Sequence, residues 1–305
     1  MGSALHSIFT VIVAAEFIFG NLSNGFIVLI NFMDYVLKRK LSLGDQILVF
    51  LALSRVGLIW EMFLSWLKVL KYSFSFMVGT ELRAIILSWV FSNHFSLWLA
   101  TILSIFYLLK IASFSRPVFL YLKWRVKKVL VMILLGNLVF LLFNVIQMNK
   151  YTEDWMRQYE TNTTWNVKVS AFARFSELAI FTTIVFSLVP FTVALVSFLL
   201  LIYSLWIHLQ KMKFNSIGHR DPSTKAHKSA LRIIVSFLLL YATYFMSLFI
   251  SWLSKTHQNR IGHMLCLTLG LFYPSGHSFI LMLGNPKLRQ ACLLVLRKMM
   301  YWLKH

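Results

Sequence analysis

The sequence is poor in charged residues and in cysteine. Only 13% of its 305 residues are charged, whereas 59% are hydrophobic; soluble globular domains carry about 25% charged residues. The composition excludes an ordinary soluble enzyme and a disordered chain, and it indicates a protein whose main solvent is lipid. The two cysteines, Cys266 and Cys292, lie on opposite sides of the predicted membrane, so we expect no disulfide framework.

Motifs of common enzymes and metal sites are also missing. The sequence contains no HExxH, no GxSxG and no Walker phosphate loop, and its histidines show no metal-ligand spacing. We therefore expect no enzyme and no metal or other cofactor. Transporters usually show internal repeats, and channels show polar rings or filter loops. Neither feature is evident, which leaves a transporter or channel as the less favoured alternative.

Seven stretches are long and apolar enough to cross a bilayer. A membrane-spanning helix needs about 20 mostly apolar residues. The first stretch lacks the basic start and the small-residue cleavage site of a signal peptide, so we count it as a span. The predicted fold class is all-α, a seven-helix transmembrane bundle. The spans are residues 8–33, 45–67, 84–110, 129–149, 179–207, 229–254 and 263–283.

Basic residues are divided unevenly between the two sides of this bundle. On one side lie 19 of the 30 Lys and Arg residues and on the other side 9, while two lie within spans. Because Lys and Arg favour the cytoplasmic side, we expect the N-terminus outside and the C-terminus in the cytoplasm. This topology places residues 150–178 outside as a polar loop. The loop contains the sequon Asn162-Thr163-Thr164, a predicted glycosylation site.

The chain is expected to divide into a transmembrane domain, residues 1–283, and a cytoplasmic tail, residues 284–305. Apolar residues of the tail recur at helical spacing, from Leu288 to Trp302, and its basic residues lie largely off that stripe. This pattern predicts an amphipathic helix on the inner leaflet, with a disordered basic tail as the alternative. Cys292 is a candidate for lipidation, and a free thiol is the alternative.

Polar residues and prolines inside the spans are candidates for structural or switching roles. Arg55 and Asn24 lie at one depth in neighbouring spans, so the guanidinium can donate to the Asn24 carbonyl. We favour Arg55 as a structural tie of spans one, two and seven over a ligand contact. Pro190 and Pro274 free backbone carbonyls and allow kinks at which a bistable bundle can bend.

Aromatic residues gather around an amide in the outer half of the bundle. Trp89 and Asn93 share one face of the third span. Tyr241 and Tyr244 lie in the sixth span, and Trp66 lies near the outer end of the second. Rings beside a few polar atoms suit a small, mostly apolar ligand. The alternative is ordinary helix packing.

Motifs near the ends of several spans carry a resemblance to known proteins. They are Leu51 to Arg55, Leu97 to Thr101, Phe106 to Lys110, Leu201 to Leu205 with His208, and His277 to Leu281 followed by Gly284 to Arg289. These segments resemble the taste receptor type 2 family, the bitter taste receptors, a class of G-protein-coupled receptors. The resemblance covers essentially the whole chain, and a vomeronasal-type chemoreceptor is the alternative within the class.

The resemblance implies a plasma-membrane receptor that binds small bitter compounds and activates a heterotrimeric G protein, a gustducin-like Gα with Gβγ. Leu267 stands where several members have Glu or Gln, so ligands that need a polar contact there should bind poorly. His277 and Ser278 match the family's seventh-helix ending. The family's ligand cavity maps onto Trp66, Trp89, Asn93, His94, Phe186, Tyr241 and Tyr244.

The inner ends of the spans are the expected docking site for the G protein. Basic side chains there would meet acidic groups and the terminal carboxylate of its C-terminal helix. For any single lysine, contact with lipid headgroups is the favoured alternative. The expected residues are Tyr107, Lys110, His208, Lys211 and Arg232.

Overall fold

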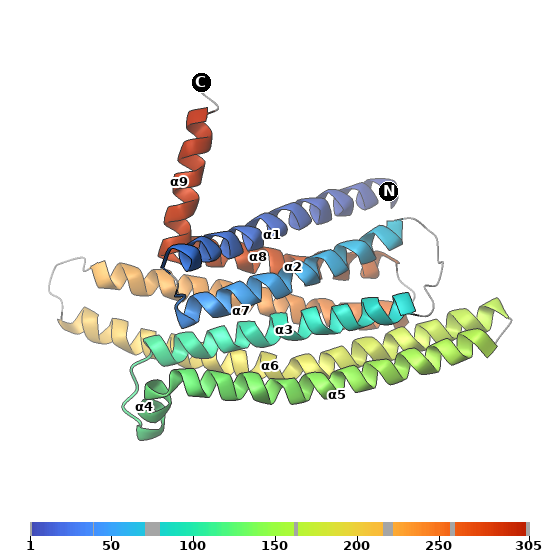
Figure 1. Cartoon of the computed structure of the whole chain (residues 1–305), viewed down its shortest axis with the longest axis horizontal. Helices are drawn as coiled ribbons and strands as arrows, with labels where there is room; N and C mark the ends of the chain where they lie inside the picture. The colour runs from blue at the N-terminus through green and yellow to red at the C-terminus, as the bar shows by residue number, and fades with distance from the viewer. Residues whose placement is uncertain are drawn as a thin grey trace.

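The computed structural model describes residues 2–38, 40–70, 80–161, 164–215, 222–256 and 260–302. These residues form nine α-helices and no strand (Figure 1). The helices are α1 (Gly2–Lys38), α2 (Leu43–Leu70), α3 (Thr80–Ile111), α4 (Pro117–Trp124), α5 (Val126–Thr161), α6 (Trp165–Asn215), α7 (Pro222–Thr256), α8 (Arg260–Gly284) and α9 (Pro286–Trp302).

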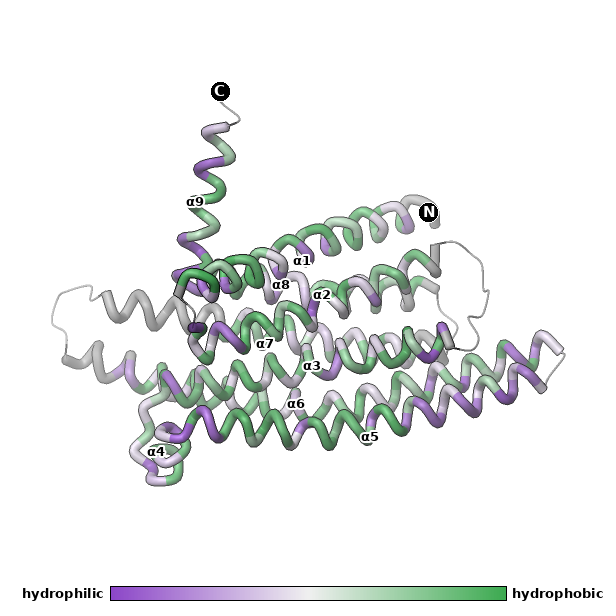
Figure 2. Tube along the Cα trace, in the orientation of Figure 1, coloured by the Kyte–Doolittle hydropathy of each residue, from purple (hydrophilic) through white to green (hydrophobic). Residues whose placement is uncertain are grey.

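Seven of these helices are long and apolar enough to cross a membrane, which confirms the predicted fold class. They are α1, α2, α3, α5, α6, α7 and α8, and they run side by side in one bundle (Figure 1). Figure 2 shows apolar residues along the middle of the bundle and hydrophilic residues towards its ends. Helices suit this setting because lipid offers no partners to backbone N–H and C=O groups. The direction of the bundle in the membrane stays a prediction.

Helices α3 and α8 occupy the centre of the bundle. In its most apolar stretch α3 is 72% buried and α8 is 61% buried, whereas α5 is only 22% buried. Helix α8 packs against α1, α2 and α7, and α3 packs against α2, α5 and α6. Polar groups that must act inside the protein are therefore expected on α3 and α8, while α5 presents most of its surface to lipid.

Residues 150–178 are mostly helical, so the prediction of a polar loop there is wrong. Helix α5 continues to Thr161 and α6 begins at Trp165. The two helices extend beyond the other spans at the end opposite α9, which the predicted orientation places outside (Figure 1). Trp155 packs on Phe172 across this hairpin, with ring centroids 5.6 Å apart. This aromatic contact supplies tertiary burial, which stabilises helices better than local propensity does.

The two prolines lie inside helices that continue through them. Pro190 is in α6 and Pro274 is in α8. The Pro190 carbonyl accepts a hydrogen bond from Thr101 Oγ1 of α3 at 3.0 Å. The Pro274 carbonyl lies 3.0 Å from Ser278 Oγ. Each proline thus lies beside a polar contact of the bundle, and a role in switching stays a prediction.

The C-terminal segment is helical, as predicted. Helix α9 turns away from the bundle and runs across its axis (Figure 1). Leu288 is buried, Cys292 is partly buried against the core, and Trp302 is exposed. Among the described residues, no disulfide joins Cys292 to Cys266 of α8. Attachment of α9 to the inner leaflet and lipidation of Cys292 remain predictions.

Candidate ligand site and polar network

A hydrogen bond joins two of the predicted cavity residues across the bundle. The Tyr244 hydroxyl of α7 donates to Asn93 Oδ1 of α3. Both side chains are buried, at 0% and 4% exposure. The amide and the phenol that were expected to face a ligand therefore satisfy each other in this conformation.

Tyr273 of α8 lies beside this pair. Its ring centroid is 5.1 Å from that of Tyr244 and 5.5 Å from that of Tyr241. The Tyr241 ring also meets Phe191 of α6 edge-on at 5.2 Å, and the Tyr241 hydroxyl is buried. Neither Tyr273 nor Phe191 was predicted from the sequence to line the cavity. Tyr273 precedes His277 by four residues, so the two side chains share one face of the helix. This spacing in the sequence could have identified Tyr273.

His94 lies apart from the Asn93–Tyr244 pair. Successive residues of a helix point about 100° apart, and the His94 ring is 6.1 Å from the Trp98 ring, which packs on Phe140 of α5 at 5.7 Å. His94 therefore belongs to the α3–α5 interface.

The remaining predicted cavity residues lie on α2, α3 and α6. Trp66 is fully buried in the main core, Trp89 is partly buried between that core and the α3–α5 interface, and Phe186 of α6 is partly buried. Among the described contacts, no ring pair or hydrogen bond joins these three side chains to the Asn93–Tyr244 pair.

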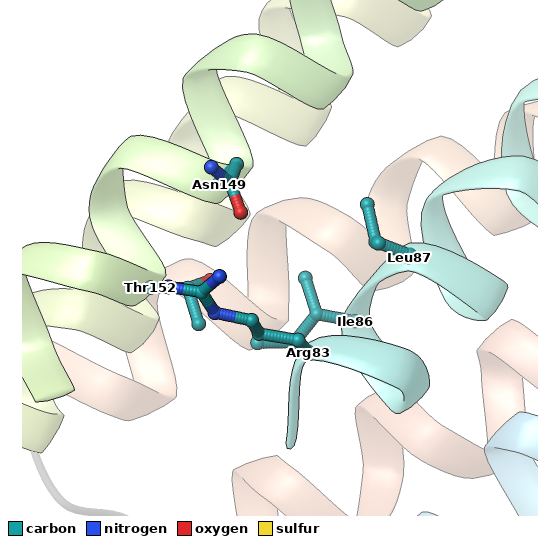
Figure 3. Close-up of a pocket in the computed structure, with 5 residues that line it drawn as sticks. All are labelled: Arg83, Ile86, Leu87, Asn149 and Thr152. Carbon is teal, nitrogen blue, oxygen red and sulfur yellow. The ribbon is translucent and has the colours of Figure 1, made fainter. Parts of the chain in front are cut away.

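Three of the predicted cavity residues are packed inside the protein in this structure. Trp66, Tyr241 and Tyr244 are at most 1% exposed, so they contact protein rather than open space. A shallow crevice lies elsewhere, between α3 and α5 near their ends opposite α9, and Figure 3 shows the residues that line it. It encloses no space for even a water molecule, whereas sites for drug-sized ligands measure about 300–1,000 Å³, so it cannot hold such a ligand. It is lined by Arg83, Ile86, Leu87, Asn149 and Thr152.

A second polar centre in the bundle is formed around the buried guanidinium of Arg55. Its guanidinium donates to Ser278 Oγ at 3.1 Å, to the Tyr273 hydroxyl at 3.5 Å, and to His277 Nδ1. The Tyr273 ring also lies 5.3 Å from the guanidinium carbon. The buried cation has neutral acceptors and an aromatic face around it, which offset part of its desolvation.

Arg55 reaches Asn24 through Ser278 rather than directly. The Ser278 hydroxyl donates to Asn24 Oδ1 at 2.7 Å while its oxygen accepts from Arg55. The direct Arg55–Asn24 bond expected from the sequence is absent from the described contacts, because the hydroxyl of α8 lies between the two side chains. The network nevertheless links α1, α2 and α8, the three helices named in the prediction.

The residues predicted to face a G protein lie at those ends of α3, α6 and α7 that the predicted orientation places in the cytoplasm. Tyr107 is partly buried, whereas Lys110 and His208 are exposed. The Lys110 ammonium lies 5.3 Å from the Phe106 ring centroid. Lys211 and Arg232 belong to α6 and α7, and their side chains lie outside the described part of the structure. Asn162, the predicted glycosylation site, lies outside the described residues altogether.

An ion cluster where α9 meets α1 and α2 was not predicted from the sequence. The Lys287 ammonium of α9 lies 2.6 Å from Asp34 Oδ2 and 3.6 Å from Asp45 Oδ2. It also donates to Asn31 Oδ1 at 2.7 Å. The cluster ties α9 to the inner ends of α1 and α2. Within the described ranges, no group of three or more His, Cys, Asp or Glu side chains is placed to hold a metal ion.

Comparison with known proteins covers the whole chain. Residues 1–300 match the family model of the taste receptor protein TAS2R. The chain is 64% identical over 305 residues to taste receptor type 2 member 13 of Mus musculus, covering 100% of both chains. It is 64% identical over 296 residues to member 13 of Rattus norvegicus, covering 97% of both. It is 61% identical over 304 residues to member 13 of Homo sapiens, again covering 100% of both.

Proposed function

We propose that this chain, which belongs to the taste receptor type 2 family, binds small bitter compounds between α3 and α7. Membership of the family makes it a G-protein-coupled bitter taste receptor, a multi-pass plasma-membrane protein and not an enzyme. The family match also sets aside a vomeronasal-type receptor, a transporter and a channel.

The hydrogen bond between Asn93 and Tyr244 is the observation that supports this site. It joins α3 to α7 through one neutral contact. A neutral hydrogen bond contributes only about 0.5–1.5 kcal/mol, so a ligand with its own donor and acceptor can replace it. The surrounding rings of Tyr241 and Tyr273 supply apolar area, and the buried Tyr241 hydroxyl is a further polar group.

Tyr273 offers a route from this site to the Arg55 network. It contacts the rings of Tyr244 and Tyr241 on one side and the Arg55 guanidinium on the other. A ligand that separates α7 from α3 therefore changes the surroundings of α8. The ligand activates only if it binds the active bundle more tightly than the inactive one, since equal affinity shifts no population.

The predicted G-protein contacts belong to α3, α6 and α7, at the end of the bundle that the predicted orientation places in the cytoplasm. We propose that these helix ends part and accept the C-terminal helix of a gustducin-type Gα, next to Tyr107, Lys110 and His208. Lys211 and Arg232 lie on the same inner segments of α6 and α7. Coupling to gustducin rests on the family resemblance.

A calcium assay in cells that co-express a gustducin-type Gα chimera tests the ligand site. After a library screen identifies an agonist, Asn93→Ala is compared with wild type. We expect potency to fall about tenfold, from loss of a contact worth about 1–3 kcal/mol. Asn21→Ala is the matched control, because the Asn21 amide bonds the Phe17 carbonyl of its own helix. Equal potency of Asn93→Ala and wild type at equal surface expression would refute the site.

A further inference from the structure

Helix α4 is held in one orientation at the inner end of the bundle. The Lys123 ammonium donates to the Ala112 carbonyl at 2.9 Å, and the backbone N–H of Ser113 donates to Ser204 Oγ of α6 at 3.1 Å. The Phe114 ring meets Phe119 of α4 edge-on at 5.1 Å. The side chains on the opposite face of α4 are therefore presented outward in a defined direction.

That outward face is apolar and aromatic. Val118 is 72% exposed, Tyr121 is 57% exposed and Trp124 is 89% exposed. No residue of α4 is buried. Figure 1 shows α4 at the same end of the bundle as α9, directly before α5 enters it. Tyr and Trp are enriched where membrane meets water, because their rings are amphipathic.

Cations surround this face. Arg116, Arg125, Lys127 and Lys128 are exposed within thirteen residues of chain, and the Arg125 guanidinium lies 5.0 Å from the Tyr121 ring centroid. No acidic residue occurs between Glu81 and Glu153. Four or more Lys and Arg residues just cytoplasmic of a membrane span favour anionic lipids such as phosphatidylserine.

We propose that α4 and the first turn of α5 bind anionic phospholipid headgroups of the inner leaflet. In this arrangement Val118, Tyr121 and Trp124 enter the headgroup layer, while Arg116, Arg125 and Lys128 contact phosphate and carboxylate groups. A lipid surface is favoured over a protein partner because the apolar face continues into the lipid-facing side of α5, where Val131, Met132 and Leu135 are exposed. We name Arg116, Val118, Tyr121, Trp124, Arg125 and Lys128 the α4 surface.

Native mass spectrometry of the purified full-length receptor in detergent tests this surface. Phosphatidylserine or phosphatidylcholine is titrated in, and the bound lipids are counted. We expect wild type to retain phosphatidylserine at lower concentrations than phosphatidylcholine. The triple variant Arg116→Gln/Arg125→Gln/Lys128→Gln should lose roughly tenfold or more of its phosphatidylserine affinity, because each surface cation contributes severalfold to binding.

Two matched variants separate the lipid site from general charge and from folding. Lys150→Gln/Arg157→Gln/Arg174→Gln removes three exposed cations of the α5–α6 hairpin at the opposite end, and it should bind phosphatidylserine as wild type does. Arg116→Lys/Arg125→Lys/Lys128→Arg keeps every charge of the α4 surface and should also retain the lipid. Equal loss in the hairpin variant would overturn the proposal.

A signalling assay decides between lipid and G protein as the partner of the α4 surface. If the glutamine triple variant keeps phosphatidylserine binding but no longer activates the G protein, the surface is a protein contact and the proposal is wrong. Trp124→Ser adds a second readout. In nanodiscs that contain phosphatidylserine, we expect faster amide hydrogen exchange in α4 of this variant than in wild type, and equal exchange would count against insertion.

Discussion

The two polar centres of the bundle differ in how they are held. Arg55 is a buried cation whose contacts include a charge-assisted bond, a ring face and a hydroxyl shared with Asn24, and these join three helices. The Asn93–Tyr244 pair joins α3 to α7 through one neutral bond, beside the Tyr241 ring. Moving the Arg55 side chain out of the first centre would leave buried polar groups without hydrogen-bond partners. Only one neutral hydrogen bond must break to separate Asn93 from Tyr244, so we expect the second centre to be the one that opens for a ligand.

Arg55→Ala should have the largest effect. It leaves His277, Ser278 and Tyr273 without a buried donor, and each unsatisfied group costs about 1–3 kcal/mol. We expect surface expression to fall severalfold and the thermal midpoint of the purified receptor to drop. Arg83→Ala is the control, since Arg83 is partly exposed and pairs with Glu153 at 3.3 Å. Equal surface expression of the two variants would show that the Arg55 contacts stabilise the bundle no more than the Arg83–Glu153 pair does.

Lys287→Met should have the next largest effect, because the Lys287 ammonium joins α9 to the adjacent ends of α1 and α2. Its ammonium bonds Asn31 and Asp34, and the side chain is 30% exposed, so we expect a loss of about 1 kcal/mol. Backbone amides of α9 should then exchange with solvent several times faster. Lys298→Met removes an exposed cation from the same helix and should leave this exchange unchanged. Unaltered exchange in Lys287→Met would show that the cluster does not hold α9.

Tyr244→Phe tests the easily opened centre. It removes one hydroxyl and keeps the ring, so the bundle should fold while the bond to Asn93 is lost. We expect basal G-protein signalling to rise about fivefold, from loss of about 1 kcal/mol of inactive-state stabilisation. Tyr203→Phe is the matched control, because Tyr203 of α6 is exposed and stacks on Phe114 through its ring. Unchanged basal signalling in Tyr244→Phe would show that this bond does not restrain the receptor.

Tyr273→Phe should have the smallest effect, and it tests the link between the two centres. The variant keeps the stacking with Tyr241 and Tyr244 and removes a long 3.5 Å bond to Arg55. We expect the maximal agonist response to fall by about half, with surface expression retained, because such a long contact contributes less than about 1 kcal/mol. A normal maximal response would mean that ligand contacts reach the inner ends by another path.

Much of this architecture could be predicted from hydropathy and helical spacing. The spans were long enough to count, and Arg55 stood out because a charge inside an apolar run is rare. The Ser278 bridge and the turning of His94 towards α5 could not be predicted. Spacing along one helix shows which residues share a face, but the rotation of neighbouring helices decides what that face meets.

The sequence by itself determined the seven spans and the family, because apolar length and local motifs are properties of single segments. Only the tertiary structure decided that Asn93 meets Tyr244, that Tyr273 lies between the two centres, and that residues 150–178 are mostly helical. These features depend on side chains from distant segments, and each such contact exists only once the helices have packed.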